Sequence, residues 1–471
     1  MKEKNTFLEL YFILNEEAKT KFSAFLKRHD EDYYAEFQKI KGILSRKNRD
    51  IATIKLHVFE KLYPNLEYKD VSIRLLFSDL LSCLKRFLYY DQNQHQLEYH
   101  IELNFLKFLR NNNQNRLFEN QHTTILKKLD IQDSLLSLKF EKKYEVNYEL
   151  CQFESTTNRF NHTNFNSLIE NLDISHLIKK LHHYIELLTI ESISSSSIHF
   201  PLIEESIDLI YSKKWDEIPE ISIYLKAIKL IKNSEDENNF FAFKELMNSN
   251  SLNWGLNEFQ FFGKIALNYC IKKINQFHAE FYVETLHLYN HGVIHKWLLE
   301  NGKMNGATYK NIISLCIRMK EIEQAEYYLE SYKPLINEDI SESYYQFNKA
   351  RIHKEKQEYK KALVLLNSNI FKDPLIEVNA RIEVIKILFE QKDYELCINK
   401  VHSVMNWIKR NKELGYHREY YINFLKLTLR VCNSSFNGTK EERKELVKMI
   451  KAEAKMVEKS WLIDQFAKTM N

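Results

Sequence analysis

The sequence predicts an all-α protein: an N-terminal helical bundle followed by an irregular right-handed superhelix of helical hairpins, an α-solenoid. Two observations predict this class. The 471 residues include only eight Gly and five Pro, whereas sheet-rich proteins need many of both at their turns. In addition, a weak pattern recurs three times between residues 306 and 410 with a period of about 35 residues, which is typical of stacked helical hairpins.

Small residues mark the three copies of this pattern. Each copy has an apolar helical face, a short polar break, and then an aromatic or aliphatic residue three positions before a small one. The small residues are Ala325, Ala362 and Cys397. Because they recur after 37 and then 35 residues, we expect three successive hairpins of equal construction.

Residues 1–90 are expected to form the N-terminal bundle. Asn15 is placed to begin a helix over residues 16–28, and further helices are expected over 33–44 and 50–62. A fourth helix starts at Asp70, which is a favourable N-cap. Its apolar face consists of Ile73, Leu76, Phe77, Leu80, Leu84 and Phe87.

Residues 91–200 read as a helical connecting region, with polar breaks at 111–113 and 161–166 and a Ser-rich loop at 192–197. Residues 201–471 are expected to form the repeat region. Its first hairpins pair 204–213 with 219–232, 238–249 with 257–274, and 278–290 with a short helix over 293–300. A capping box opening at Thr439 predicts a terminal helix that covers the end of the solenoid.

Composition favours a cytoplasmic protein. The net charge is only +4, and the chain has neither a basic arm nor an acidic tail. The six cysteines are scattered, which predicts buried free thiols rather than disulfides or metal ligands. The N-terminal apolar run is interrupted by Glu9 and lacks a cleavage site, so we expect neither a signal peptide nor a membrane span.

The stretch from Ser343 to Pro374 resembles one tetratricopeptide repeat. Counted from Ser343, the matching positions are eight, seventeen, twenty and thirty-two, occupied by Ala350, Tyr359, Ala362 and Pro374. The tryptophan usual at position four is absent, since Gln346 stands there. Weaker copies lie on either side, so the resemblance covers residues 306–410. The whole chain also resembles an uncharacterised family of long helical bacterial proteins.

The tetratricopeptide resemblance implies a scaffold that binds a peptide or partner protein in a concave groove. Carried over position by position, it implies these groove residues: Lys310, Arg318, Tyr344, Phe347, Arg351, Lys354, Lys386 and Phe389. Five cations among aromatic rings suit an acidic peptide with an aromatic residue. The alternative is that these five cations are ordinary solvent-exposed residues on one face of a Lys-rich chain. The family's carboxylate clamp is not implied, because Glu383 replaces one of its cations.

No motif in the sequence predicts catalysis, a metal or a cofactor. Phosphate-binding Gly loops, HExxH and nucleophile motifs are all missing. The adjacent His182 and His183 point about 100° apart on a helix and cannot share one ion, and His176 is two turns away. We therefore expect a non-enzymatic protein–protein interaction scaffold.

The alternative function is a DNA-binding transcriptional regulator whose repeats sense or dimerise. Residues 50–90 are weakly similar to the helix-turn-helix core of bacterial activators. Residues 1–90 hold 17 Lys and Arg against 13 Asp and Glu. No β-hairpin wing follows, and the helix from Asp70 uses much of its surface for apolar residues, which suits packing more than reading a groove. We therefore rank this function second.

Overall fold

The computed structural model describes residues 4–44, 50–92, 94–131, 136–157, 164–191, 199–249, 255–276, 278–368, 371, 373–415, 417–437, 440–453 and 455–470. These residues form 23 α-helices, three short 3₁₀ helices and one two-stranded β-hairpin, which confirms the all-α class. The helices divide into two compact units. The first comprises Met1–Ile131 and Lys142–Asn171, and the second comprises Gln132–Glu141 and Leu172–Asn471.

The first unit contains two hydrophobic cores. Five helices share the first core: α1 (Thr6–Ile13), α2 (Glu16–His29), α3 (Glu31–Leu44), α4 (Ile51–Leu62) and α5 (Asp70–Gln92). The second core lies among α6 (Gln94–Asn111), α7 (Asn115–Ile131) and α8 (Leu136–Thr157). Helices α8 and α9 (Phe165–Glu191) are each divided between the two units, and residues 136–141 and 172–191 belong to the second.

Local capping signals place the first helices where the sequence predicts them. The side chain of Asn15 accepts a hydrogen bond from the Ala18 amide at 2.8 Å and begins α2. Helix α1 was not predicted. It follows a second asparagine cap, Asn5, which accepts from the Leu8 amide at 3.0 Å. The apolar run that we examined as a leader segment thus contributes Phe7 and Tyr11 to the core.

Helix α5 buries the face that its spacing predicts. All six of its predicted core residues are at most 5% exposed. Asp70 is the first residue of the helix, and its carboxylate binds Lys55 at 3.0 Å and Arg74 at 2.7 Å. The exposed side carries Val71 and Leu75 beside Arg74. DNA binding through this segment remains the alternative function, ranked second.

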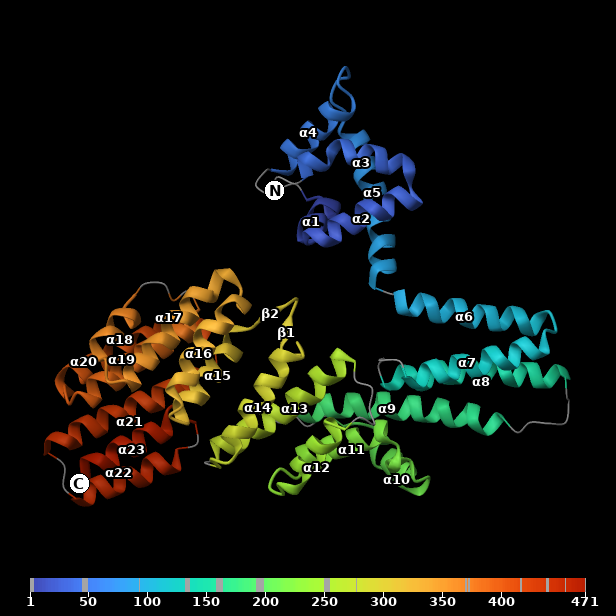
Figure 1. Ribbon diagram of the computed structural model, residues 1–471. Helices are drawn as coiled ribbons and strands as arrows, with labels where there is room; N and C mark the ends of the chain where they lie inside the picture. The colour runs from blue at the N-terminus through green and yellow to red at the C-terminus, as the bar shows by residue number, and fades with distance from the viewer. Residues whose placement is uncertain are drawn as a thin grey trace. The chain divides into compact units, whose positions relative to one another are not determined.

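The second unit continues with paired helices (Figure 1). Its helices after α9 are α10 (Ile203–Ser212), α11 (Pro219–Lys232), α12 (Asn238–Met247), α13 (Leu256–Asn275), α14 (Phe281–Ile294), α15 (Gly306–Arg318), α16 (Ile322–Tyr332), α17 (Glu338–Glu355), α18 (Tyr359–Leu366), α19 (Pro374–Glu390), α20 (Tyr394–Arg410), α21 (His417–Asn437), α22 (Lys440–Ala452) and α23 (Lys459–Met470). The three 3₁₀ helices are Trp215–Glu217, Lys333–Leu335 and Lys412–Leu414. Among the described helices, none is long and apolar enough to cross a bilayer. The predicted cap Thr439 and loop 192–197 lie outside the described residues.

Two details differ from the predicted hairpins in residues 201–300. The closest neighbours are α11 with α12 and α13 with α14, so the pairing is shifted by one helix. The short helix expected over 293–300 is wrong. Helix α14 ends at Ile294, and a β-hairpin of β1 (Leu299–Glu300) and β2 (Lys303–Met304) follows. Asn301 and Gly302 both have positive φ, 52° and 75°, and Asn-Gly is the preferred pair for such a two-residue turn.

Three helix–helix turns in residues 306–410 have the same backbone hydrogen bonds. In each, one residue has a left-handed φ near 60°: Lys320, Gln357 and Lys392. In each, the next amide donates to a carbonyl five residues back, from Glu321 to Cys316, from Glu358 to His353 and from Asp393 to Leu388. This is the Schellman ending of a helix. The turns recur after 37 and 35 residues, like the small residues that follow them.

The small residues of the pattern are fully buried. Ala325, Ala362 and Cys397 each lie at the start of the second helix of a pair, and all are 0% exposed. Ala350 on α17 is equally buried, and α17 packs closely on α18, the helix of Ala362. Helix α17 also packs against α15 and α19, so each pair contacts the next.

We predict that Ala362→Leu destabilises the second unit by about 1–3 kcal/mol, because a larger side chain overpacks a fully buried contact. Val364→Leu is the matched control, since Val364 lies on the same helix and is 74% exposed. Thermal and urea unfolding of both variants measure the effect. Equal stability of the two variants would contradict the close contact of α17 with α18.

Candidate binding surface

The eight implied groove residues come from three neighbouring helices of the second unit. Helix α15 carries Lys310 and Arg318, α17 carries Tyr344, Phe347, Arg351 and Lys354, and α19 carries Lys386 and Phe389. Because α17 packs against both α15 and α19, the structure brings the three sets of residues to neighbouring positions.

The structure separates these residues into a buried and an accessible group. Five are buried: Tyr344, Phe347, Lys354, Lys386 and Phe389. Lys310 and Arg351 are half-buried, and Arg318 is exposed. An open surface position for the five is therefore wrong, because other parts of the second unit cover them. Their role in partner binding stays a prediction.

Tyr344 illustrates how a predicted groove residue becomes part of the core. Its ring lies against Gly306, where a Cβ atom would stand only 2.4 Å from the ring. The phenol donates a hydrogen bond to Asp373 at 2.9 Å. The glycine at the start of α15 thus allows α17 to approach, and it leaves no free ring face for a peptide.

A carboxylate at the centre of the cluster explains why the lysines are buried. Glu383 on α19 is 4% exposed and is surrounded by three cations. Its oxygens lie 2.9 Å from the Lys386 ammonium, 3.4 Å from that of Lys354 and 3.5 Å from Nε of Arg351. Lys354 also lies 3.1 Å from Glu390. Each buried charge therefore has an opposite charge within contact distance, as burial requires.

The protonation states follow from these contacts. Burial alone would raise the pKa of Glu383, but Lys386, Lys354 and Arg351 outweigh it and hold the pKa far below its usual range. Burial would likewise lower the pKa of Lys354, but Glu383 and Glu390 hold it above its ordinary value. Glu383 and Lys354 are therefore both ionised at neutral pH.

The C-terminal segment of the chain covers this cluster. Glu458, which has a left-handed φ of 52°, places its carboxylate 2.9 Å from the Lys386 ammonium. One helical turn later, the indole N–H of Trp461 donates to Glu390 at 2.8 Å. The ammonium groups of Lys354 and Lys386 lie 5.9 and 5.6 Å from the Trp461 ring, within reach of a cation–π attraction.

An open cavity of about 220 Å³ remains beside the cluster. The implied groove residues Lys310, Arg318, Phe347 and Arg351 contribute to its wall. The acidic part of the wall consists of Glu383 and Glu458, both of which are already paired with cations. Arg351 donates to the Ser314 hydroxyl as well as facing Glu383. The cavity wall combines these polar side chains with apolar ones such as Ile271, Ile274 and Leu315, and its residues come from α13, α14, α15, α17 and α19 together with Glu458.

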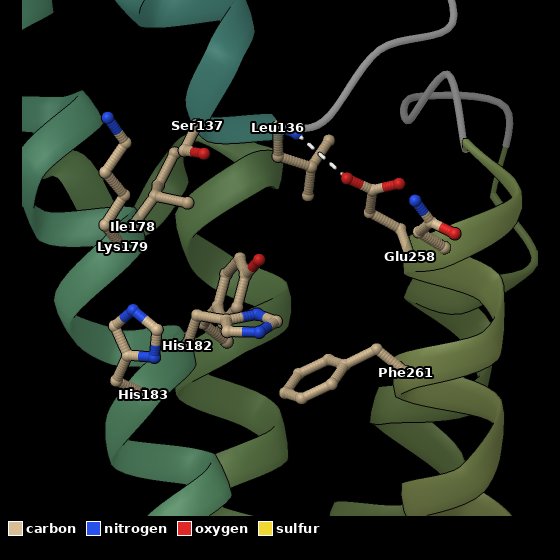
Figure 2. A pocket seen from close by; sticks show the side chains of 10 residues that line it. Leu136, Ser137, Ile178, Lys179, His182, His183, Glu258 and Phe261 are labelled. Carbon is tan, nitrogen blue, oxygen red and sulfur yellow. Dashed lines mark hydrogen bonds between the residues drawn. The ribbon is translucent and has the colours of Figure 1, made fainter. Parts of the chain in front are cut away.

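A second cavity, of about 200 Å³, lies among α8, α9, α11 and α13 (Figure 2). His182 and Phe261 both line it, and their rings stack on each other with centroids 4.1 Å apart. At its upper end Glu258, 5% exposed, accepts a hydrogen bond from the Leu136 amide at 3.2 Å (Figure 2). Its other oxygen has no partner among the described residues.

The position of Glu258 explains its burial without a ligand. It lies in the first turn of α13 and bonds the first amide of α8, so one carboxyl group serves the N-termini of two helices. Gly255 is required beside it, since a Cβ there would lie 2.6 Å from the free oxygen. Burial raises the pKa of Glu258, although the backbone hydrogen bonds oppose the shift. We therefore assign this carboxyl a structural role.

Among the described residues, His176, His182 and His183 belong to no group with metal-ligand spacing. His182 stacks on Phe261, and Nδ1 of His183 lies 2.9 Å from Glu186. Among the described residues, one group has metal-ligand spacing: Glu237, His278 and Glu280. The Lys273 ammonium lies 3.1 Å from Glu237 and already neutralises it. The geometry favours an ion-pair cluster.

Comparison of the chain with family models, with curated proteins and with solved structures gives no match. The binding surface is therefore argued from its residues alone. Sequence reasoning missed Glu458 and Trp461. The sequence did contain a signal for them. The implied groove predicts an acidic segment with an aromatic residue, and an acidic and an aromatic residue one turn apart match that description.

We predict that Glu383→Gln lowers the free energy of unfolding at pH 7 by about 3–5 kcal/mol, because it leaves buried cations without their counter-charge. Urea unfolding measures the change. Glu377→Gln on the same helix is the control, since its partly exposed pair with Arg381 contributes under about 1 kcal/mol.

The pH dependence of the free energy of unfolding provides a second test with the same variant. The pKa of Glu383 is depressed by folding, so its stabilisation is present above the unfolded pKa and is lost as pH falls below it. The difference between wild type and Glu383→Gln should shrink as the pH falls below about 4.5. A difference that is constant from pH 7 to pH 3 would contradict an ionised cluster.

The stability of Glu258→Gln relative to wild type should depend on pH in the opposite direction. Folding raises the pKa of Glu258, so its ionised form costs stability at neutral pH, and this cost disappears as the pH falls through the raised pKa. The glutamine variant keeps an acceptor for the Leu136 amide and should melt higher than wild type at pH 7.5, with a smaller gain at pH 5. Glu205→Gln, at an exposed position, is the control. A lower melting temperature for Glu258→Gln at pH 7.5 would contradict this assignment.

Proposed function

We propose that this chain is a non-enzymatic interaction protein that binds an acidic segment of a partner protein on the surface formed by α15, α17 and α19. In this proposal residues 306–410 are tetratricopeptide-like hairpins stacked in a right-handed superhelix. Support comes from the three turns with the same hydrogen bonds and from the buried small residues at the same spacing. The proposal places the protein in the cytoplasm and assigns it no cofactor.

The main support for the proposal is the chemistry of the C-terminal segment that covers part of this surface. An acidic residue, Glu458, and an aromatic residue, Trp461, contact the cations that we selected as the binding site for an acidic, aromatic peptide. The chain's own segment is thus an example of the chemistry that this surface accepts. The neighbouring open cavity presents Lys310 and Arg318, so a partner's acidic side chain has a position that requires no rearrangement.

Electrostatics determines what such binding should be like. Each exposed cation contributes little by itself, and an attraction between solvated charges weakens as salt screens it. Most of the affinity would come from an aromatic side chain that packs beside the charges. We therefore expect modest affinity and a clear salt dependence.

Selection of peptides from a random phage library on the full chain tests this function. We expect the enriched sequences to share acidic residues near an aromatic one. Lys310→Glu combined with Arg318→Glu should weaken their binding at least tenfold, about 1.4 kcal/mol. Lys426→Glu changes the same charge at an exposed position of α21 and is the control.

Fluorescence polarisation of the labelled peptides at two salt concentrations gives the affinities. Peptides without acidic residues would contradict the proposal. So would peptides that bind the double variant and the control variant equally well.

A further inference from the structure

The wall of the open cavity contains two cations, Lys310 and Arg318, that form no ion pair with another described residue. In total, the wall contains three cations and two carboxylates. Both carboxylates are engaged, since Glu383 faces Arg351 and two lysines, and Glu458 binds Lys386. Within the part of the chain that the structure describes, neither Lys310 nor Arg318 has an ion pair or a side-chain hydrogen bond. Two cations therefore line one cavity without an ion-pair partner in the described chain, although Glu458 and Asp373 attract Lys310 from further away.

Lys310 is the more unusual of the two cations. Its side chain is half-buried, and only its backbone carbonyl is engaged, by the Ser314 hydroxyl at 2.6 Å. Burial lowers the pKa of Lys310, the guanidinium of Arg351 adds to this effect, and the carboxylates of Glu458 and Asp373 oppose it only in part. An ammonium group held out of water beside like charges is unfavourable unless an anion joins it.

Neutral donors accompany these cations in the cavity wall. The side chain of Asn275, at the end of α13, has no hydrogen-bond partner among the described residues. The Asn311 amide makes only a long contact of 3.5 Å with the Tyr289 hydroxyl. The cavity therefore offers two unpaired cations and two amide groups with donors available. Such a set of donors suits oxyanions rather than apolar ligands.

We propose that this cavity binds a dianionic phosphate group through Lys310 and Arg318, with Asn275 and Asn311 donating to its remaining oxygens. A phosphomonoester carries a charge of about −1.5 to −2 at pH 7, which balances the two unpaired cations. A single carboxylate balances only one of them. Glu383 and Glu458, which also line the cavity, are already paired with cations. The phosphate belongs to a small metabolite or to a phosphorylated protein, and only the second source rests on the proposed function.

Isothermal titration of the full chain with phenyl phosphate and phenyl sulfate tests the proposal at matched ionic strength. The two probes have similar shapes, but the sulfate ester carries one negative charge. We expect phenyl phosphate to bind at least tenfold more tightly. Equal affinity of the two probes, or no binding of phenyl phosphate at millimolar concentration, would overturn the proposal.

The variant Lys310→Met tests whether Lys310 binds the phosphate group. Methionine keeps an apolar stem of similar length, so the variant should melt at or above the wild-type temperature while binding phenyl phosphate at least tenfold more weakly. Lys426→Met at an exposed position is the control. Unchanged binding by a folded Lys310→Met protein would also overturn the proposal. Loss of binding that accompanies a lower melting temperature is resolved by Arg318→Met, an exposed position that folding does not need.

A phosphoserine peptide compared with free phosphoserine distinguishes the two sources. Tighter binding of the peptide by at least tenfold supports a phosphorylated protein, and equal binding supports a small phosphorylated molecule. Failure of the peptide selection together with binding of phenyl phosphate would reject the partner function and keep the phosphate site. Peptides that bind independently of Lys310 and Arg318 would reject the phosphate site and leave partner binding elsewhere on the surface.

Discussion

The carboxylate of Glu383 is the constraint on which the C-terminal half of the second unit depends. It is almost completely excluded from water and lies among three cations. A buried ion pair contributes little to stability when it is complete, yet it is costly when one partner is removed. Helices α17 and α19 must therefore keep the relative position that places these charges together. The cluster fixes the geometry more than it adds to stability.

The same cluster requires the C-terminal segment. Lys354 and Lys386 bring more positive charge than Glu383 balances, and Glu390 and Glu458 provide the remaining carboxylates. Glu458 reaches its position with a left-handed backbone, which costs of order 1 kcal/mol for a residue with a side chain. This strain is offset by the pairing with Lys386 and by the ring contacts of Trp461 with Phe389 and Phe424. The terminal segment is thus both a cover for the last hairpins and a counter-charge.

Local signals made the helical fold predictable from the sequence. The caps Asn15 and Asp50 and the apolar spacing of α5 depend on residues a few positions apart. The same is true of the recurring small residues. The β-hairpin at Asn301-Gly302 was also signalled locally, by a dipeptide that prefers positive φ. We missed it because the apolar residues around it also fit a short helix.

The candidate site was less predictable because its chemistry depends on distant pairs. Helical position alone placed eight residues on three adjacent helices, but it did not distinguish solvated lysines from paired ones. Lys386 finds its second carboxylate 72 residues further along the chain, at Glu458. In a chain so rich in Lys and Glu, many such pairs are equally compatible with the composition. Only the packing of the terminal segment selects this one.

The pairing of Lys386 with Glu458 determines where on this surface an anionic ligand can bind. The paired cations around Glu383 are satisfied, and an incoming anion gains little there because it must displace Glu458 and Trp461. Helix α23 is held by its contacts with α21 and α22, so displacement would disturb the end of the unit. Lys310 and Arg318 have no such competitor among the described residues. An anionic ligand therefore gains most at the open cavity, where binding supplies a missing charge and breaks no existing pair.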